Sequence, residues 1–299
     1  MKLVTFERGG AARPGLLADK GVLDLASAAA GRKTPIISVL QILSDPAARD
    51  LVGELAAGAK ADLWQPLAEC KLLAPIPVPA RNIFCVGRNY KLHIEEGARA
   101  RGVAPTFPAV PEYFTKPATA VIGQGAEIRL DPKLTQQLDY EVELAMVIGK
   151  RCRDLSVAEA MSAVAGYTIV NDISARDLQR AHGQWFKGKG LDTFCPIGPC
   201  IVTSDEYGDP SGRRIALRVN GAIRQESSTA DLLFNCAILV SALSAGLTLL
   251  PGDIIATGTP SGVALGMTPQ LWLKDGDVVE AEVEGIGALK NVVRDVSKR

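Results

Sequence analysis

The hydrophobic positions of this 299-residue chain fall mostly into short alternating or continuous runs, which are typical of strands. In the first 74 residues these runs predict strands at 3–6 and 22–25, and helical spacing predicts helices at 36–43 and 47–57. Beyond residue 82 the pattern predicts a strand-rich region, with strands at 83–86, 126–130, 140–148, 167–170, 215–219, 253–256 and 277–283.

Local signals add turns and helices to this pattern. Asn220-Gly221 lies between two strand-like runs and predicts a tight hairpin. Ser156 and Glu159 have the spacing of a capping box, which predicts that a helix begins there. Residues 229–245 are expected to form the longest helix of the chain.

A proline-rich segment divides the chain. Pro75, Pro77 and Pro79 cannot continue a helix or a central strand. We therefore expect a small N-terminal α/β accessory domain over residues 1–74, a linker over 75–82 and a larger domain over 83–299. The expected fold class is α+β, rich in strand.

A row of carboxylates enters the most apolar of the predicted strands. Asp139, Glu141 and Glu143 would share one face, because alternate side chains of a strand point the same way. Asp172 follows the next apolar run and could reach the same point. Acids gathered in apolar surroundings require a cation, so this row predicts a metal site. The alternative is a solvated face of an amphipathic strand, against which the apolar residues 144–148 argue.

The residue inventory narrows the choice of metal. The chain has two histidines and six cysteines, without the C-x-x-C pair that zinc sites use. Carboxylate oxygens favour Mg²⁺ or Mn²⁺, and Ca²⁺ if the site is roomy. A calcium-binding module is excluded, because the D-x-[DN]-x-[DN]-G loop is missing.

Charge and hydropathy restrict the partners. Basic and acidic residues balance at 33 each, which argues against a nucleic acid or a membrane surface as partner and favours a small-molecule substrate. No segment has the apolar length of a membrane span or a signal peptide, so a cytoplasmic protein with reduced cysteines is expected.

His93 and Glu96 form a second candidate group. They stand three residues apart on an expected helix, so they would face the same side. A carboxylate beside an imidazole raises its basicity, which suits a base that takes a proton from water. The alternative is an ordinary surface pair. The polar residues 97–112 that follow are expected to form a loop over the substrate.

Three later segments offer groups for an anionic substrate. Arg176 and Gln179 stand three apart on a helix that begins near Asp172, where they could clamp a carboxylate, although a helix-surface arginine would look the same. Lys189 lies between two glycines that let the backbone approach a ligand. Thr259 belongs to a turn-rich loop, which alone is a weak signal.

Six motifs, in order from about residue 83 to 293, resemble those of the fumarylacetoacetate hydrolase family. They are G-R-N-Y-x-x-H-x-x-E, Y-F-x-K-P, D-Y-E-x-E-L, N-D-I-S-A-R-D-L-Q, G-K-x-x-D-T-F-C-P-I-G-P and T-G-T-P-x-G-V. The resemblance implies the mixed β-roll of that family's C-terminal domain, a homodimer, bound Mg²⁺ or Mn²⁺, and a small oxo-acid substrate. Gly190 departs from the pattern, since relatives often have serine there.

The resemblance also assigns roles. It implies that the metal ligands are Glu141, Glu143 and Asp172, without Asp139. It implies that His93, Glu96 and Lys189 are catalytic, and that the substrate contacts are Arg176, Gln179, Thr259 and Lys116.

The expected reaction is hydrolysis of a carbon–carbon bond in a 2,4-dioxo acid such as an acylpyruvate, fumarylpyruvate or a fumarylacetoacetate-like acid. The products would be pyruvate or a related acid and a carboxylic acid, and the His93-Glu96 pair favours this reaction. Similar proteins with the same metal set decarboxylate oxaloacetate, or isomerise and decarboxylate 2-hydroxyhepta-2,4-diene-1,7-dioate, and this is the alternative. A non-catalytic metal-binding scaffold is the third possibility.

Overall fold

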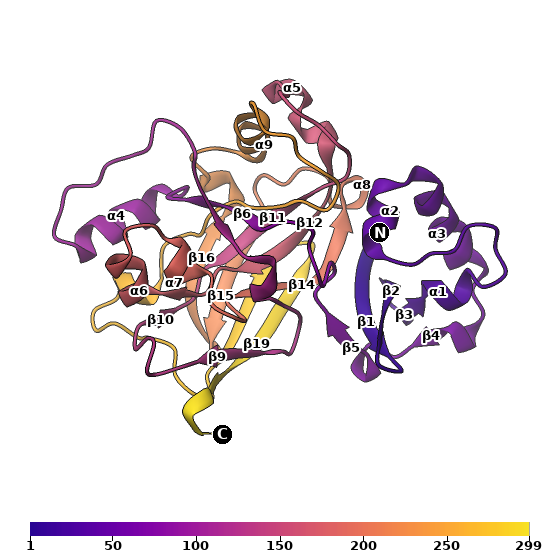
Figure 1. The fold of residues 1–299 in the computed structure, drawn as a ribbon, viewed down its shortest axis with the longest axis horizontal. Helices are drawn as coiled ribbons and strands as arrows, with labels where there is room; N and C mark the ends of the chain where they lie inside the picture. The colour runs from indigo at the N-terminus through magenta and orange to yellow at the C-terminus, as the bar shows by residue number, and fades with distance from the viewer. Residues whose placement is uncertain (299) are drawn as a thin grey trace.

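The computed structural model describes residues 1–298, and one large sheet crosses most of the molecule (Figure 1). Its strands, in spatial order, are β4 (Trp64–Gln65), β3 (Gly21–Asp24), β2 (Ala11–Ala18), β1 (Lys2–Arg8), β14 (Cys195–Thr203), β12 (Val164–Asn171), β11 (Val142–Ile148), β17 (Ile254–Ala256), β6 (Ile83–Gly87) and β7 (Glu112–Lys116). Two short strands join this path at its side, β5 (Lys71–Leu73) on β1 and β8 (Val121–Ile122) on β14.

Two smaller sheets complete the strand arrangement. One has the order β16 (Ala222–Ser228), β15 (Arg214–Val219), β18 (Val278–Val283), β19 (Gly287–Asp295) and β9 (Glu127–Leu130). The other pairs β10 (Leu138–Asp139) with β13 (Ser174–Ala175). The fold is therefore mixed and rich in sheet, as expected.

Strand β11 is buried on both faces. Val142, Leu144 and Met146 pack into the core that the large sheet shares with β15, β18 and β19. Ala145 and Val147 point the other way, into a core that includes the N-terminal segment. This double burial explains why the run from residue 144 to 148 is continuously apolar.

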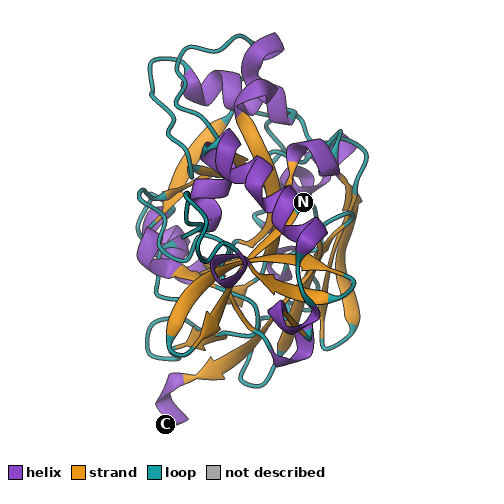
Figure 2. Ribbon diagram, turned by 90° about the vertical axis from the view of Figure 1, so that its right-hand side faces the viewer, coloured by secondary structure: helices purple, strands orange, loops and turns teal. Residues whose placement is uncertain are grey.

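The N-terminal segment shares both a sheet and a core with the rest of the chain. Strand β1 pairs with β14 in the register Lys2↔Val202 and Leu3↔Ile201. Figure 2, viewed from the side of this segment, shows its helices in front of the strands. They are α1 (Leu25–Ala28), α2 (Val39–Ser44) and α3 (Pro46–Gly58). The division at residues 75–82 remains a prediction, since the hydrogen bonds of the large sheet cross it.

The remaining helices lie at two places. Figure 1 shows α4 (Lys91–Ala100), α6 (Arg176–Ala181) and α7 (Phe186–Lys189) together at the end of the molecule opposite the N-terminal segment. Helices α5 (Val157–Ala160) and α9 (Cys236–Ser244) pack against each other, and α8 (Ser204–Tyr207) lies on β12 and β14. In residues 1–298 no helix combines the length and the apolar character needed to cross a membrane.

The expected long helix at 229–245 is wrong. Only a 3-10 turn at Thr229–Asp231 and helix α9 form there. Between them the backbone bonds to Asn89, whose carbonyl oxygen accepts from Leu233 N at 2.8 Å and whose side-chain Oδ1 accepts from Phe234 N at 2.8 Å. These tertiary hydrogen bonds compete with helical ones, and α9 then begins with Asn235 as its N-cap.

The other local predictions agree with the structure. All the predicted strands form, with shifts at their ends, and so do the helices at 36–43 and 47–57. The Ser156-Glu159 capping box is present. Asn220 and Gly221 have φ of 52° and 82° and join β15 to β16, as a type I′ hairpin requires. The pattern missed several strands, among them β2, β19 and β14. In β14, Pro196, Gly198 and Pro199 made residues 195–203 look like a loop.

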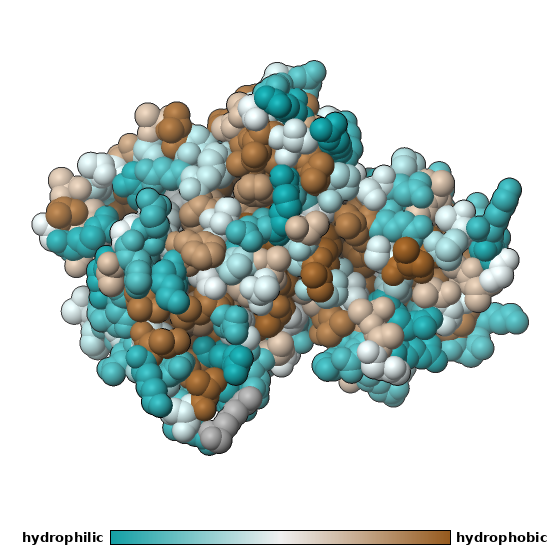
Figure 3. Space-filling view, in the orientation of Figure 1, coloured by the Kyte–Doolittle hydropathy of each residue, from teal (hydrophilic) through white to brown (hydrophobic). Residues whose placement is uncertain are grey.

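The visible surface gives no single apolar face. Brown apolar residues form several small groups among polar ones (Figure 3). Exposed large apolar side chains are correspondingly scattered over many elements. Isolated apolar residues of this kind are normal on a protein surface.

Leu3→Ala tests whether the N-terminal segment folds with the rest. Leu3 is fully buried in the shared core, so its truncation should lower the free energy of unfolding by about 2–5 kcal/mol in one cooperative transition. Leu67→Ala, at a side chain that is 44% exposed, should change it by less than about 0.5 kcal/mol. Urea unfolding followed by circular dichroism measures both; two separate transitions in the wild type would show an independent N-terminal domain.

Candidate active site

Two antiparallel strands bring the acids together. Val142 of β11 pairs with Asn171 of β12, which places Glu141 beside Asp172, and the Asp172 amide donates to the Glu141 carbonyl oxygen at 2.8 Å. Glu143 follows on the same strand. One carboxylate oxygen from each of these three residues lies within 4.8 Å of the others, and all three residues are buried. The predicted convergence is confirmed, and a solvated strand face is excluded.

Three buried cations lie against these acids. The Lys189 ammonium is 2.6 Å from both Glu141 Oε2 and Asp172 Oδ2. Lys116 Nζ donates to Asp172 Oδ1 at 2.5 Å, and Arg176 Nη2 donates to Glu141 Oε1 at 2.5 Å. Glu141 and Asp172 each have two cationic partners, and removing one cation would leave these buried carboxylates with less compensating charge, which is destabilising.

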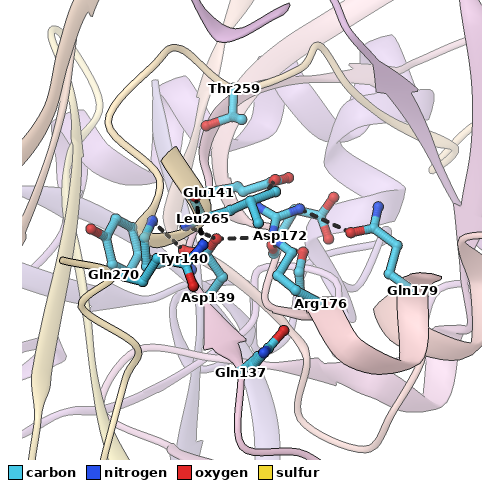
Figure 4. A network of polar contacts seen from close by, with 12 residues as sticks. Gln137, Asp139, Tyr140, Glu141, Asp172, Arg176, Gln179, Thr259, Leu265 and Gln270 are labelled. Atoms are coloured by element: carbon cyan, nitrogen blue, oxygen red, sulfur yellow. Dashed lines mark hydrogen bonds and ion pairs between the residues drawn. The ribbon is translucent and has the colours of Figure 1, made fainter. Parts of the chain in front are cut away.

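Asp139 has a different task from the other acids. It lies in β10, and the long strand begins only at Val142. Its Oδ2 accepts from Arg176 Nε at 2.8 Å, and its Oδ1 accepts from the amide of Ala264 at 2.8 Å. Figure 4 shows Arg176 between Asp139 and Gln179. Asp139 therefore fixes the guanidinium group, in agreement with its expected absence from the ligand set.

The electrostatics of the cluster fit a divalent cation. Burial, together with the charges of Asp172 and Glu141, raises the pKa of Glu143 well above its usual range. Burial alone would also raise the pKa of Glu141, but Arg176, Lys189 and His93 hold it below its usual range. The three acids thus include one whose charge the protein does not compensate. Hard carboxylate oxygens at this spacing are suitable ligands for Mg²⁺ or Mn²⁺.

Lys189 remains a cation. Burial would lower the pKa of its ammonium group, but Asp172 and Glu141 raise it above its usual range. For Arg176 too, burial would lower the pKa, but the charges of Glu141 and Asp139 raise it above its usual range. Both groups are fixed positive charges in the site.

The histidine and glutamate predicted to act together are neighbours on α4. His93 Nδ1 is 3.5 Å from Glu96 Oε2. Glu96 is 6% exposed and accepts from the amide of Gly262 at 3.0 and 3.1 Å. A β-carbon at Gly266 would stand 2.0 Å from Glu96 Cγ, so only glycine leaves room for this carboxylate. The surface-pair alternative is excluded, because Glu96 is buried and His93 lines the cavity.

A cavity of about 530 Å³ opens over the cluster. Glu141, Glu143 and Lys189 line its floor, and His93, Arg176 and Gln179 line its walls, with Thr259. The sequence thus predicted seven of its lining residues. Trp185 forms part of the wall, with its ring on the backbone of Gly87, where a β-carbon would come within 2.1 Å of the indole.

The structure corrects the expectation for Lys116. Its side chain is fully buried, does not line the cavity, and donates to Asp172 and to the carbonyl oxygen of Ile173 at 3.0 Å. Lys116 therefore positions an acid of the cluster instead of contacting the substrate. Two of the three N–H donors of its ammonium group are bound by these protein acceptors.

Gln179 and Thr259 offer donors to a ligand. Gln179 Oε1 accepts from Arg176 Nη1 at 3.1 Å, which leaves the amide NH₂ of this side chain to donate. Thr259 Oγ1 accepts from Gln225 Nε2 at 2.8 Å, which leaves the threonine O–H to donate. Figure 4 shows Thr259 and Gln179 on different sides of Glu141. The cavity walls therefore offer donors to carboxylate oxygens.

Sequence reasoning missed two positioning residues. Gln225 of β16 is fully buried; its Oε1 accepts from Val142 N at 3.0 Å while its Nε2 holds Thr259. Asn89, also fully buried, donates to the carbonyl oxygens of Thr257 at 2.8 Å and Phe234 at 3.0 Å. Asn89 stands in the first motif, but no local signal marks Gln225, which reaches the site from another sheet.

Comparison with known proteins agrees with this geometry. The family described as Fumarylacetoacetate (FAA) hydrolase C-terminal matches residues 82–294. The chain is 47% identical over 228 residues to the oxaloacetate tautomerase YisK of Bacillus subtilis, covering 76% of this chain and 74% of that protein.

Two solved structures match nearly the whole chain. A fumarylacetoacetate hydrolase from Exiguobacterium antarcticum superposes with a TM-score of 0.79 at 39% identity and covers 99% of both chains. A 2-hydroxyhepta-2,4-diene-1,7-dioate isomerase from Mycobacterium marinum superposes with a TM-score of 0.74 at 35% identity, again over 99% of both. The motifs, the site and these likenesses agree, and the chain belongs to the fumarylacetoacetate hydrolase family.

Proposed function

We propose that this protein is a Mg²⁺- or Mn²⁺-dependent enzyme that converts the enol form of a small 2-oxo dicarboxylic acid, of the oxaloacetate type, into its keto form. The observation that carries the proposal is the buried group of Glu141, Glu143 and Asp172, of which Glu141 and Glu143 line the same cavity as His93. The similarity to a protein named oxaloacetate tautomerase favours this reaction over the hydrolysis that sequence reasoning preferred.

Substrate binding follows from the free donors of the cavity. The amide NH₂ of Gln179 and the O–H of Thr259 donate to carboxylate and oxo oxygens of the substrate. Arg176 makes three hydrogen bonds to Asp139, Glu141 and Gln179, so it holds the floor rigid. A site in which donors are fixed before binding loses little free energy to reorganisation.

Charge at the floor stabilises the reacting form. A divalent ion held by Glu141, Glu143 and Asp172 would supply Lewis-acid stabilisation of the negative charge on the enolate. Lys189 adds a fixed positive charge at the same place, because it bonds to two of the three acids. Since Lys189 remains protonated there, it does not serve as the base.

His93 is the group that moves the proton. Its Nδ1 faces Glu96, which leaves Nε2 for the substrate. The enol O–H gives up its proton, and its bonding pair forms the second bond of the C2 carbonyl. The π pair of the C2=C3 double bond then takes one proton at C3. One proton leaves the oxygen and one is added to carbon, so substrate and product are isomers. The reaction therefore needs no water, oxidant or reductant. Glu96 orients His93 and stabilises the imidazolium that forms.

Hydrolysis of a 2,4-dioxo acid is the second candidate. The same His93-Glu96 pair could activate water toward a carbonyl carbon, and the similar structure from Exiguobacterium antarcticum is named a fumarylacetoacetate hydrolase. Both reactions would pass through an enolate, which the positive charges at the floor of the cavity would stabilise. They differ in whether His93 acts on the substrate itself or on water.

Substrate comparison separates the two reactions. Purified protein with Mn²⁺ should accelerate the enol-to-keto conversion of oxaloacetate, followed as loss of the ultraviolet absorbance of the enol. Acetylpyruvate and fumarylpyruvate should release little pyruvate in a lactate dehydrogenase assay. Rapid pyruvate release from these acids without effect on the oxaloacetate enol would favour the hydrolase instead.

Loss of an acid should remove the metal. Glu141→Ala is expected to weaken Mn²⁺ binding by at least about 100-fold, since the loss of an outer partner alone commonly costs about 10- to 100-fold. Titration calorimetry with Mn²⁺ measures the change. Asp192→Asn, at an acid whose side chain is 75% exposed, is the matched control and should bind normally. Equal affinity in Glu141→Ala and the control would contradict the assignment.

Loss of the base should spare the metal. His93→Ala is expected to lower kcat for the oxaloacetate enol by about 100- to 10,000-fold, the usual contribution of general acid–base catalysis. Its Mn²⁺ affinity should stay within about twofold of the wild-type value. Glu96→Gln should lower kcat less, because His93 remains present. A joint loss of metal and activity in His93→Ala would place His93 among the ligands.

A further inference from the structure

The cavity carries more positive charge than its floor requires. Its lining includes five cationic side chains but only two carboxylates, Glu141 and Glu143. The cations are Arg88, Arg101, Arg176, Arg180 and Lys189. Such an excess in a concave site raises the local concentration of anionic ligands.

Three of the five cations already have acidic partners. Arg176 and Lys189 are bound to the acids of the floor. Arg88 is held by Glu112 through two hydrogen bonds of 2.7 Å. The positive charges of these three side chains are already paired with carboxylates of the protein, so they attract a second anion only weakly.

Arg101 and Arg180 remain. In the part of the chain that the structure describes, the Arg101 side chain has no hydrogen-bond or ion-pair partner. The only such partner of the Arg180 side chain there is the neutral Gln137, whose Oε1 accepts from Nη2 at 2.5 Å. Both arginines line the cavity, one directly after α4 and the other on α6. Both residues are exposed, so both can meet a ligand that enters this cavity.

We infer that Arg101 and Arg180 together bind the second carboxylate of the substrate and so select dicarboxylic over monocarboxylic 2-oxo acids. The inference rests on the proposed function for the position of the first carboxylate at the floor. A guanidinium group pairs with a carboxylate through two parallel N–H bonds, which lysine cannot reproduce. An acid that lacks this carboxylate leaves both arginines without an anion.

The same contact would bear on catalysis. Arg101 directly follows the helix that carries His93 and Glu96. A carboxylate held between Arg101 and Arg180 links that helix to α6, whose Arg176 and Gln179 contact the floor. Binding of the far end of the substrate would thus position the base His93. Binding energy from a part of the substrate that does not react would in this way raise kcat.

A purely structural role is the competing explanation. Both arginines lie at the C-terminal ends of helices, where a positive charge stabilises the helix dipole. That role would affect stability and would not distinguish ligands. Arg99 of α4 carries the same charge near the same helix end, is exposed, and does not line the cavity, so Arg99→Gln is a matched control.

The test compares oxaloacetate with pyruvate, which is the same acid without the second carboxylate. Binding is measured on Mn²⁺-loaded protein in the His93→Ala background, so that turnover does not consume oxaloacetate. Titration calorimetry should give tighter binding of oxaloacetate than of pyruvate. Arg101→Gln and Arg180→Gln should each weaken oxaloacetate by about 10-fold, as for the loss of one charge-assisted hydrogen bond, and leave pyruvate within about twofold.

Each outcome decides the inference. The double variant Arg101→Gln/Arg180→Gln should bind the two acids equally, and Arg99→Gln should keep the wild-type preference and the wild-type melting temperature. Equal weakening of both acids, or no change for either, would overturn the inference. Kinetics with His93 present separate it from the proposed function. If oxaloacetate enol is not converted but the arginine-dependent preference persists, the proposed reaction fails and the carboxylate site stands.

Discussion

The rest of the structure depends on the balance of charge in one buried group. Glu141, Glu143 and Asp172 bring three carboxylates within 4.8 Å of one another, where mutual repulsion and loss of hydration oppose folding. Lys116, Lys189 and Arg176 offset two of these acids through short hydrogen bonds. Glu143 is left as the acid whose charge needs a cation. A protein that keeps such a cluster retains it for binding, since apolar packing would stabilise the core at lower cost.

The surrounding fold holds this cluster in place. Strands β11 and β12 are buried on both faces and fix the acids at their ends. Residues outside this pair then lock the loops around the site. Gln225 reaches across from the smaller sheet, and Asn89 ties the strand end at residue 87 to the loop of Thr257. The close approach of Glu96 to Gly266, and of Trp185 to Gly87, leaves no room for a side chain at either glycine.

The cavity has an inner and an outer part with different tasks. The inner part contains the acids, Lys189 and the free donors of Gln179 and Thr259, and it suits the 2-oxo acid portion that different substrates of the family have in common. The rest of the lining includes Arg101 and Arg180, for which we infer a role in substrate selection. Similar proteins bear the names of a tautomerase, an isomerase and a hydrolase while sharing one fold, so the fold alone does not fix the reaction.

The sequence by itself determined what depends on neighbouring residues. Apolar runs predicted about half of the strands, turn chemistry predicted the hairpin at Asn220-Gly221, and ordered motifs predicted the acids, the His93-Glu96 pair and Lys189. Only the tertiary structure decided the pairing of charges, because the partners are far apart in the chain; Lys189 and Glu141 are separated by 48 positions. For the same reason it alone placed Lys116 beneath Asp172, broke the helix expected at 229–245 through Asn89, and brought Arg101 and Arg180 to one cavity. Local propensity does not predict such contacts, because their free energy arises only when distant segments meet and exclude water.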